Sequence, residues 1–452
     1  MSLNKGKNII SGNIPITFFK FTLPNVAGLV AMSSAGIIDG MFVGLYIGEN
    51  ALAAVNIVMP IYSIVFGIAI MLTIGGAVRT GKYLGEKDEF KANTMFTKII
   101  VVITVVSIAI TTICLLFNKQ VVKIFGADKV LEPYAMEYLT ILSLFFFFQV
   151  MQYALSVFVR VDGRPYLSSG ALVIGSTINA VLDYIFIKVL GFGLTGAALA
   201  TGISAIIPFF LLISHFFSRA NKLKLVKISG GWKEVLSAAY NGSSELLSEM
   251  SAGIVLFIFN WIMITNIGPQ GVAAFTSINY ILWACGMFCY GVGDSVVPLV
   301  SVNYGAKKVL RIKKFMFLAL ISVFAICICI FIVMVFIPQE IISIFLPDRN
   351  SEAFFMALEF ASYIKWGILF TGLNIIFSSY FTAIQRPIES VIIASSRGLI
   401  FPVISVITLL NIFGVKGTYM ALPLSEIITI AIAIILWKLN SPSKQIERIS
   451  GM

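Results

Sequence analysis

Apolar stretches of helix length constrain this sequence more than any other feature. A helix needs about 20 apolar residues to cross a bilayer. The predicted spans are 14–47, 51–79, 92–117, 132–158, 166–190, 193–217, 235–266, 271–301, 310–338, 352–381, 387–413 and 416–438. Only 12% of the 452 residues are charged, against about 25% in soluble domains. Membrane β-barrels need alternating polarity, which runs such as Leu142–Phe148 lack. We therefore predict an all-α polytopic membrane protein with twelve transmembrane helices.

The basic residues are distributed unevenly between the two sides of the predicted spans. Of the 32 Lys and Arg residues, 22 lie in the termini and the even-numbered connections, and six lie in the odd-numbered ones. By the positive-inside rule, both termini face the cytoplasm and the protein belongs to the cytoplasmic membrane. The basic residues lie in short loops, where they set the orientation of the helices in the membrane. They therefore do not indicate a nucleic-acid partner.

Short motifs recur along the chain at offsets of 220–222 residues. Such regular internal similarity indicates two homologous six-helix bundles, related by a pseudo-two-fold axis along the membrane normal. A cleft between the bundles would hold a substrate, and one chain forms a complete pathway, so a monomer is expected. The paired segments are Ile47–Ala54 with Ile267–Ala274, Leu84–Lys87 with Tyr304–Lys307, Ile124–Asp128 with Ile344–Asp348, Arg164–Pro165 with Arg386–Pro387, and Gly193–Gly196 with Gly414–Gly417.

The repeat divides the chain into four predicted parts. An N-lobe covers 1–217, a basic cytoplasmic linker 218–234, a C-lobe 235–438 and a cytoplasmic tail 439–452. The basic residues of the linker are Arg219, Lys222, Lys224, Lys227 and Lys233.

Acidic residues dominate the charged groups inside the predicted spans. Each such group costs about 2.5–3.5 kcal/mol on insertion scales and usually has a function. An acidic interior suits a cationic substrate, a coupling Na⁺ or H⁺, or all three. The acidic residues are Asp39, Asp183, Glu245, Glu249, Asp294 and Glu426, and the deep basic residues are Lys20, Lys365 and Arg397.

Two of these carboxylates have polar or hinge-forming neighbours. Asn179 and Asp183 are four residues apart, so they share one helix face, where the amide can orient the carboxylate or share its cation. Asp39 lies in a glycine-rich stretch that allows close helix approach. Pro24, upstream on the same helix, can kink it. A titratable group and a hinge on one helix predict a gate, with a structural hydrogen-bonded pair as the alternative.

The second half of the chain carries further candidates. Glu245 and Glu249 are one helical turn apart and would repel each other, although helix-dipole stabilisation is an alternative for Glu245. Asp294 is another candidate, and Arg397 is interpreted as neutralising one of these carboxylates. No role is assigned to Glu426, and His215 is expected at the membrane interface.

Several kinds of chemistry are disfavoured by the sequence. No Gly-rich loop ends in Gly-Lys-Ser or Gly-Lys-Thr, so ATP hydrolysis is not expected. The single histidine excludes His-based triads and multi-histidine metal sites. The cysteines lie in apolar stretches and are interpreted as small apolar side chains; they are Cys114, Cys285, Cys289, Cys327 and Cys329. An enzyme is not predicted, and no cofactor is expected beyond a coupling ion.

Four motifs of the chain are specific when taken together: Pro24 with Asp39, Arg160–Gly163, Asn179–Ile187 and Gly193–Thr201. With these motifs and its two six-helix repeats, the chain as a whole resembles the multidrug and toxic compound extrusion (MATE) family. The resemblance implies a V-shaped, alternating-access antiporter that expels cationic amphipathic drugs or dyes in exchange for Na⁺ or H⁺.

The resemblance also implies particular coupling residues. In the branch with an N-lobe ion site, the matching positions are Asp39, Asn179, Asp183 and Thr201, with Tyr138 as an addition. The first four would also form a Na⁺ site, and ion binding would accompany bending near Pro24. Glu249 resembles a glutamate of the branch with a C-lobe cation site. That branch carries an aspartate in its tenth helix, which the stretch Thr371–Asn374 lacks, so the N-lobe site is favoured.

Two other functions remain as alternatives. A lipid-linked precursor flippase of a related fold would need a cationic cavity for phosphates, which the scarcity of interior Lys and Arg argues against. A membrane scaffold or sensor would not transport at all. The sequence leaves open the drugs carried and the choice between Na⁺ and H⁺.

Overall fold

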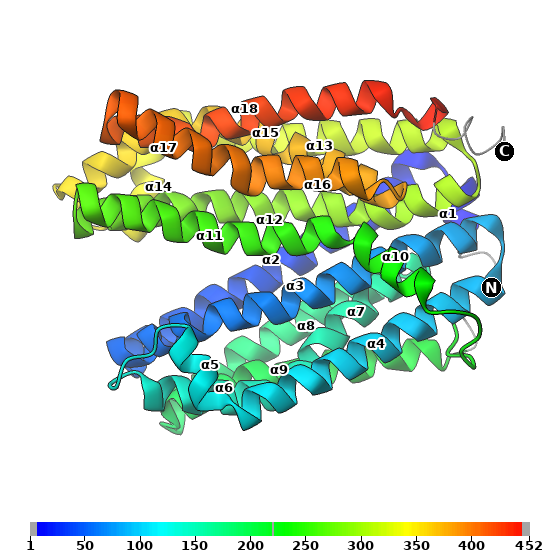
Figure 1. The fold of residues 1–452 in the computed structure, drawn as a ribbon, viewed down its shortest axis with the longest axis horizontal. Coiled ribbons are helices and arrows are strands. Elements are labelled where there is room, and N and C mark those ends of the chain that lie inside the picture. The colour runs from blue at the N-terminus through cyan, green and yellow to red at the C-terminus, as the bar shows by residue number, and fades with distance from the viewer. Residues whose placement is uncertain (1–6, 219–220, 445–452) are drawn as a thin grey trace. The chain divides into compact units, whose positions relative to one another are not determined.

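The protein is built from helices throughout the part of the chain that the structure describes (Figure 1). The computed structural model describes residues 7–218 and 221–444. Residues 1–6, Arg219 of the predicted linker and residues 445–452 of the predicted tail lie outside the described residues. Every regular element within those ranges is helical, so the all-α prediction is confirmed.

The chain divides into two units, Met1–Gly242 and Ser243–Met452. The helices of the first unit are α1 (Lys7–Ser11), α2 (Ile14–Tyr46), α3 (Glu49–Glu86), α4 (Glu89–Leu116), α5 (Asn118–Ile124), α6 (Glu132–Leu144), α7 (Phe146–Val161), α8 (Pro165–Asp183), the π-helix η1 (Tyr184–Val189), α9 (Gly193–Phe216) and α10 (Lys233–Asn241). Those of the second are α11 (Ser243–Asn266), α12 (Pro269–Gly305), α13 (Val309–Phe336), α14 (Pro338–Phe345), α15 (Glu352–Ala383), α16 (Pro387–Ser395), the π-helix η2 (Ser396–Ile400), α17 (Phe401–Phe413) and α18 (Val415–Leu439).

Within the described residues, eleven helical spans are long and apolar enough to cross a membrane, and a bent pair of helices can make a twelfth. The pair is α6 and α7, which meet at an angle of 50° near Phe145. The predicted span 132–158 is therefore two helices joined by a sharp bend. Counting this pair as one span gives the predicted twelve.

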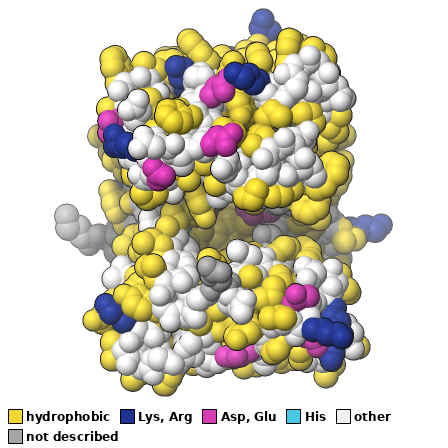
Figure 2. All heavy atoms as spheres, turned by 90° about the vertical axis from the view of Figure 1, so that its left-hand side faces the viewer, with side chains coloured by type: hydrophobic (Ala, Val, Ile, Leu, Met, Phe, Trp, Pro, Cys, Tyr) yellow, Lys and Arg dark blue, Asp and Glu magenta, His cyan; other side chains and the backbone are white. Residues whose placement is uncertain are grey.

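Charged side chains lie among many hydrophobic ones on the face that Figure 2 views. Groups of both signs are visible there.

Each unit contains a spanning helix interrupted by a π-helical turn. In the first unit, α8 ends at Asp183 and the chain continues as η1. In the second, α16 continues as η2, which carries Arg397, and then as α17. π-Helical turns are rare and occur frequently at functional sites. Both interruptions carry or adjoin an ionisable residue singled out in the sequence.

The segment between α9 and α10 is fixed to the first unit by buried polar groups. The carboxylate of Asp162 accepts hydrogen bonds from the backbone amides of Lys222 and Leu223, at 3.1 Å and 3.3 Å, and lies 2.6 Å from Nε2 of His215. From α4, Nζ of Lys98 donates to the carbonyl of Gly231 at 2.9 Å. The predicted linker thus docks on the first unit. His215, expected at the membrane interface, is buried beside Asp162.

Replacing Asp162 with alanine is expected to release this docked segment. Removing the Asp162 carboxylate leaves the amides of Lys222 and Leu223 without an acceptor, which costs about 1–3 kcal/mol. Trypsin should therefore cut at Lys222 and Lys224 ~10-fold faster, as each 1.4 kcal/mol is tenfold. Asp348→Ala is the matched control, because Asp348 also accepts a backbone hydrogen bond but lies in an exposed turn. Equal cleavage rates in the two variants would refute the docking role.

Helix α10 packs against α3 at a position that only glycine fits. A Cβ atom on Gly75 would lie 1.9 Å from the carbonyl oxygen of Ala238, whereas one on Gly170 of α8 would meet nothing within 4 Å. We expect Gly75→Ala to destabilise the protein by about 1–3 kcal/mol through overpacking. Gly170→Ala should be neutral or stabilising, because alanine favours helices. Melting temperatures in detergent test this, and a Gly75→Ala variant as stable as the wild type would contradict the packing.

Candidate functional site

The first unit buries two carboxyl groups against each other. Asp39 lies on α2 and Asp183 at the end of α8, and these two helices pack side by side. Asp39 is 6% exposed and Asp183 is fully buried. Their carboxyl groups lie within electrostatic range of each other. Because two adjacent buried carboxylates repel each other, the pair favours a shared proton or a bound cation.

The other predicted residues of the first unit surround this pair. Tyr138 of α6 is 3% exposed and lies within electrostatic range of both aspartates, and it is near Thr201 of α9. Asn179 is buried one turn before Asp183 on α8. The structure therefore brings the five predicted coupling residues together, on four helices of one bundle.

Several polar atoms of this cluster have no hydrogen-bond partner among the described residues. They are Oδ1 of Asp39, both carboxylate oxygens of Asp183, Nδ2 of Asn179 and Oγ1 of Thr201. Buried polar atoms without partners are unusual, because each costs free energy. Carboxylate and hydroxyl oxygens are the ligands of a hard cation, and the same carboxylates accept a proton. The cluster is therefore chemically suited to Na⁺ or H⁺.

Pro24 lies inside α2, on the same helix as Asp39. Proline cannot donate the hydrogen bond of its turn, so it is a site where the helix can bend. The next residue, Asn25, accepts a hydrogen bond from the guanidinium of Arg160 on α7, and both side chains are buried. This contact was not predicted, although Arg160 belongs to a motif that the sequence analysis quoted. It fixes α2 to α7 beside the proline.

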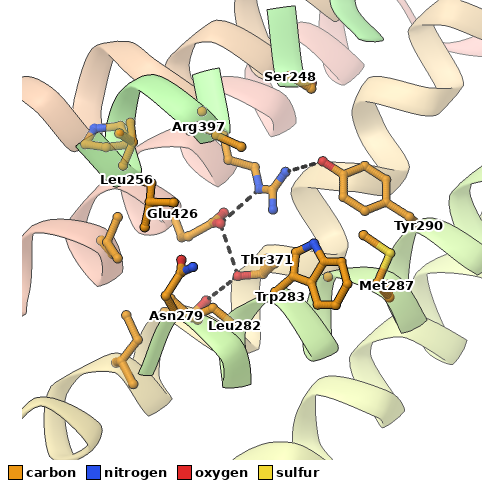
Figure 3. Close-up of a pocket in the computed structure, with 18 of the residues that line it drawn as sticks. Ser248, Leu256, Asn279, Leu282, Trp283, Met287, Tyr290, Thr371, Arg397 and Glu426 are labelled. Carbon is orange, nitrogen blue, oxygen red and sulfur yellow. Dashed lines mark hydrogen bonds and ion pairs between the residues drawn. The ribbon is translucent and has the colours of Figure 1, made fainter. Parts of the chain in front are cut away.

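In the second unit, Glu426 is the centre of a polar network (Figure 3). Its carboxylate on α18 accepts hydrogen bonds from Nε of Arg397 at 2.9 Å, Oγ1 of Thr371 at 3.1 Å and Nδ2 of Asn374 at 2.6 Å. Arg397 also donates to the hydroxyl of Tyr290 at 3.1 Å. The interpretation that Arg397 neutralises a carboxylate fits this geometry, but the partner is Glu426, for which the sequence suggested no role.

A cavity of about 210 Å³ adjoins this network. Trp283 and Met287 of α12 line it together with Arg397 and Glu426. This volume is below the roughly 300–1,000 Å³ of typical drug pockets. The cavity alone is therefore too small for a typical drug.

The remaining predicted acidic residues lie near one another at the start of α11 and on α12. Glu245 is within electrostatic range of both Glu249 and Asp294. Glu249 is exposed on the surface of its unit, and Asp294 is partly buried. Glu245 and Glu249 also lie within electrostatic range of Tyr290. Glu245 lines a small pocket together with Arg397, so this acidic group lies close to the ion pair of Glu426.

Two bundles of membrane-spanning helices, each with a polar site built from side chains of several helices, define a polytopic membrane transporter. The sequence profile of the MatE family matches residues 24–185 and 247–407, one match in each unit. The chain therefore belongs to the MatE family, whose members are membrane transporters rather than enzymes. The family resemblance and the internal duplication are both confirmed.

Individual relatives are similar to this chain along nearly its whole length. The Multidrug export protein MepA of Staphylococcus haemolyticus is 25% identical over 424 residues, covering 92% of this chain and 91% of that protein. A crystal structure of MATE in the bent conformation has a TM-score of 0.89 at 22% identity, with 99% of each chain covered. A MOP superfamily transporter from Pyrococcus furiosus also has a TM-score of 0.89 at 22% identity, covering 98% of this chain and 99% of that one. These structures support the fold.

Proposed function

We propose that this protein is a secondary-active multidrug efflux antiporter that exports cationic amphipathic compounds in exchange for H⁺ or Na⁺ by alternating access. The relative named Multidrug export protein MepA supports drug export. The proximity of the buried Asp39 and Asp183 carboxyl groups carries the proposal of ion coupling. No cofactor beyond the coupling ion is required.

Each residue of the first-unit cluster has a role in the proposed transport cycle. The cluster consists of Asp39, Tyr138, Asn179, Asp183 and Thr201. Asp39 and Asp183 take up the ion, while Asn179 and Thr201 orient them or add oxygen ligands. Tyr138 supplies a hydroxyl next to both carboxylates. Ion binding removes the repulsion between the carboxylates and so favours closer packing of α2 on α8, with Pro24 permitting the bend. A drug cation binds the state in which the carboxylates are charged, so drug and ion compete.

The proposed location is the cytoplasmic membrane, with both termini in the cytoplasm and the protein working as a monomer. The uneven distribution of Lys and Arg supports this orientation. The internal duplication supports a single chain as the transporting unit.

A flippase for lipid-linked precursors is the less favoured alternative. Such a substrate carries phosphates, which need cationic groups free to bind them. Two arginines of the helices, Arg160 and Arg397, donate from their guanidinium groups to protein acceptors, Asn25 and Glu426. The buried groups of the first-unit cluster are acidic or neutral, which favours a cationic substrate.

Dye transport in proteoliposomes tests the proposed function. The purified protein is reconstituted, loaded with ethidium, and given either a pH gradient or a Na⁺ gradient alone. We expect one of the gradients to drive ethidium against its concentration gradient. Transport of ethidium under neither gradient, by protein that is correctly folded in the same vesicles, would overturn the proposal.

A further inference from the structure

We propose that Cys285, Cys289 and Cys327 form a binding site for a soft, thiophilic metal ion within the second unit. Cys285 and Cys289 are one turn apart on α12, and Cys327 faces them from α13. Their three sulfur atoms lie within 4.8 Å of one another, with Cys289 and Cys327 separated by 3.8 Å. A metal with bonds of about 2.3 Å to three sulfurs in a trigonal plane needs sulfur separations of about 4 Å. The thiols are thus already at ligand spacing.

The packing around the thiols keeps them together. All three cysteines are buried. Gly372 of α15 lies directly over two of them, since a Cβ atom there would be 3.0 Å from the sulfur of Cys289 and 3.1 Å from that of Cys327. A third helix therefore closes the cluster, and an ion would link α12 to α13 without a change in the backbone.

The cluster lies just behind the wall of the 210 Å³ cavity. Gly286 and Met287, next to Cys285 in the chain, line that cavity. The thioether of Met287 is a soft ligand at the cavity surface (Figure 3), so it offers an intermediate binding position between the cavity and the thiols. Arg397 acts electrostatically on Cys327, and Glu426 acts on Cys285. Because Arg397 and Glu426 form an ion pair with each other, their opposite charges largely cancel, and the net electric field at the three thiols is small.

The chemistry of the site selects the kind of ion. Binding of the ion replaces any protons on the three sulfur atoms and gives a tris-thiolate complex, with no change in oxidation state. Thiolates prefer Cu(I), Zn²⁺ and similar soft ions over Na⁺ or Mg²⁺. The proposed ligand is therefore distinct from the coupling ion of the first unit.

Cadmium binding to the purified full-length protein tests the site. Cd²⁺ titration under reducing conditions, followed by the ultraviolet absorption of cadmium–thiolate bonds and by metal analysis after gel filtration, should show one ion per chain. Cys285→Ser, Cys289→Ser and Cys327→Ser should each weaken binding at least ~10-fold. Cys329→Ser is the matched control, because Cys329 is on the same helix as Cys327 but is exposed, and it should bind like the wild type.

Several results of this titration would contradict the proposed metal site. Absence of stoichiometric Cd²⁺ binding in the folded wild type would overturn the proposal. So would binding that survives unchanged in all three serine variants, or that is lost only with Cys329. Since the measurement is of binding alone, its failure would leave the proposed transport function unaffected, and failure of transport would leave the metal site unaffected.

Discussion

Asp39→Asn is expected to reduce ion-coupled efflux to below about one-hundredth of the wild-type rate, a loss of about 2.7 kcal/mol. Asparagine has nearly the shape of aspartate, so the packing of α2 on α8 should be retained. It cannot take up a proton or bring a negative charge to a cation, however, and the electrostatic interaction with Asp183 loses its dependence on the ion. Ethidium efflux from proteoliposomes, normalised to the amount of reconstituted protein, measures the effect.

The control for this variant is an aspartate outside the cluster. Asp128→Asn replaces an exposed residue in the turn before α6, where the carboxylate accepts backbone hydrogen bonds, and should transport at nearly the wild-type rate. Gel filtration and melting temperature should show that Asp39→Asn is folded. Full transport by a folded Asp39→Asn variant would remove Asp39 from the coupling site.

Arg397→Met is expected to destabilise the protein by about 3–5 kcal/mol, because it leaves the carboxylate of Glu426 without its cationic partner. The double variant Arg397→Met with Glu426→Leu should recover most of this loss, since replacing a buried ion pair by apolar side chains is often neutral. The physical reason is that desolvation offsets the attraction within the pair, whereas an isolated charge has no compensation. Thermal unfolding of the four proteins of this double-mutant cycle in detergent measures the coupling.

The same cycle distinguishes a structural pair from a functional one. If the double variant is stable and transports normally, the pair of Arg397 and Glu426 maintains the second unit only. Equal destabilisation by Arg397→Met in the presence and absence of Glu426 would contradict the pairing seen in the structure.

The main features of the fold could be predicted from the sequence because they depend on local properties. A continuous apolar stretch predicts a spanning helix whatever surrounds it, and the predicted spans match the observed helices within a few residues at most ends. The π-helical turn after Asp183 and the break at Gly242 were not predicted, since they depend on packing against neighbouring helices. The prediction for 235–266 joined α10 to α11 for this reason.

The residues of a candidate site could be predicted where their spacing or charge within a single helix indicates the site. Asn179 and Asp183 share a face of α8, and Asp39 stands out as a charge in an apolar stretch. The role of Glu426 was not predictable, because its partners come from η2 and α15. The same holds for the thiol cluster, in which Cys327 joins the other two only through the packing of α13 on α12.

The most direct test of the central claim is to measure the cation that leaves the protein when a drug binds. Tetraphenylphosphonium is added to purified protein in weakly buffered detergent solution, and released protons are followed by a pH indicator, or displaced ²²Na⁺ by equilibrium dialysis. Competition at the Asp39–Asp183 pair predicts release of H⁺ or Na⁺ from the wild type and none from the Asp39→Asn/Asp183→Asn double variant. Equal release from both proteins would contradict the account.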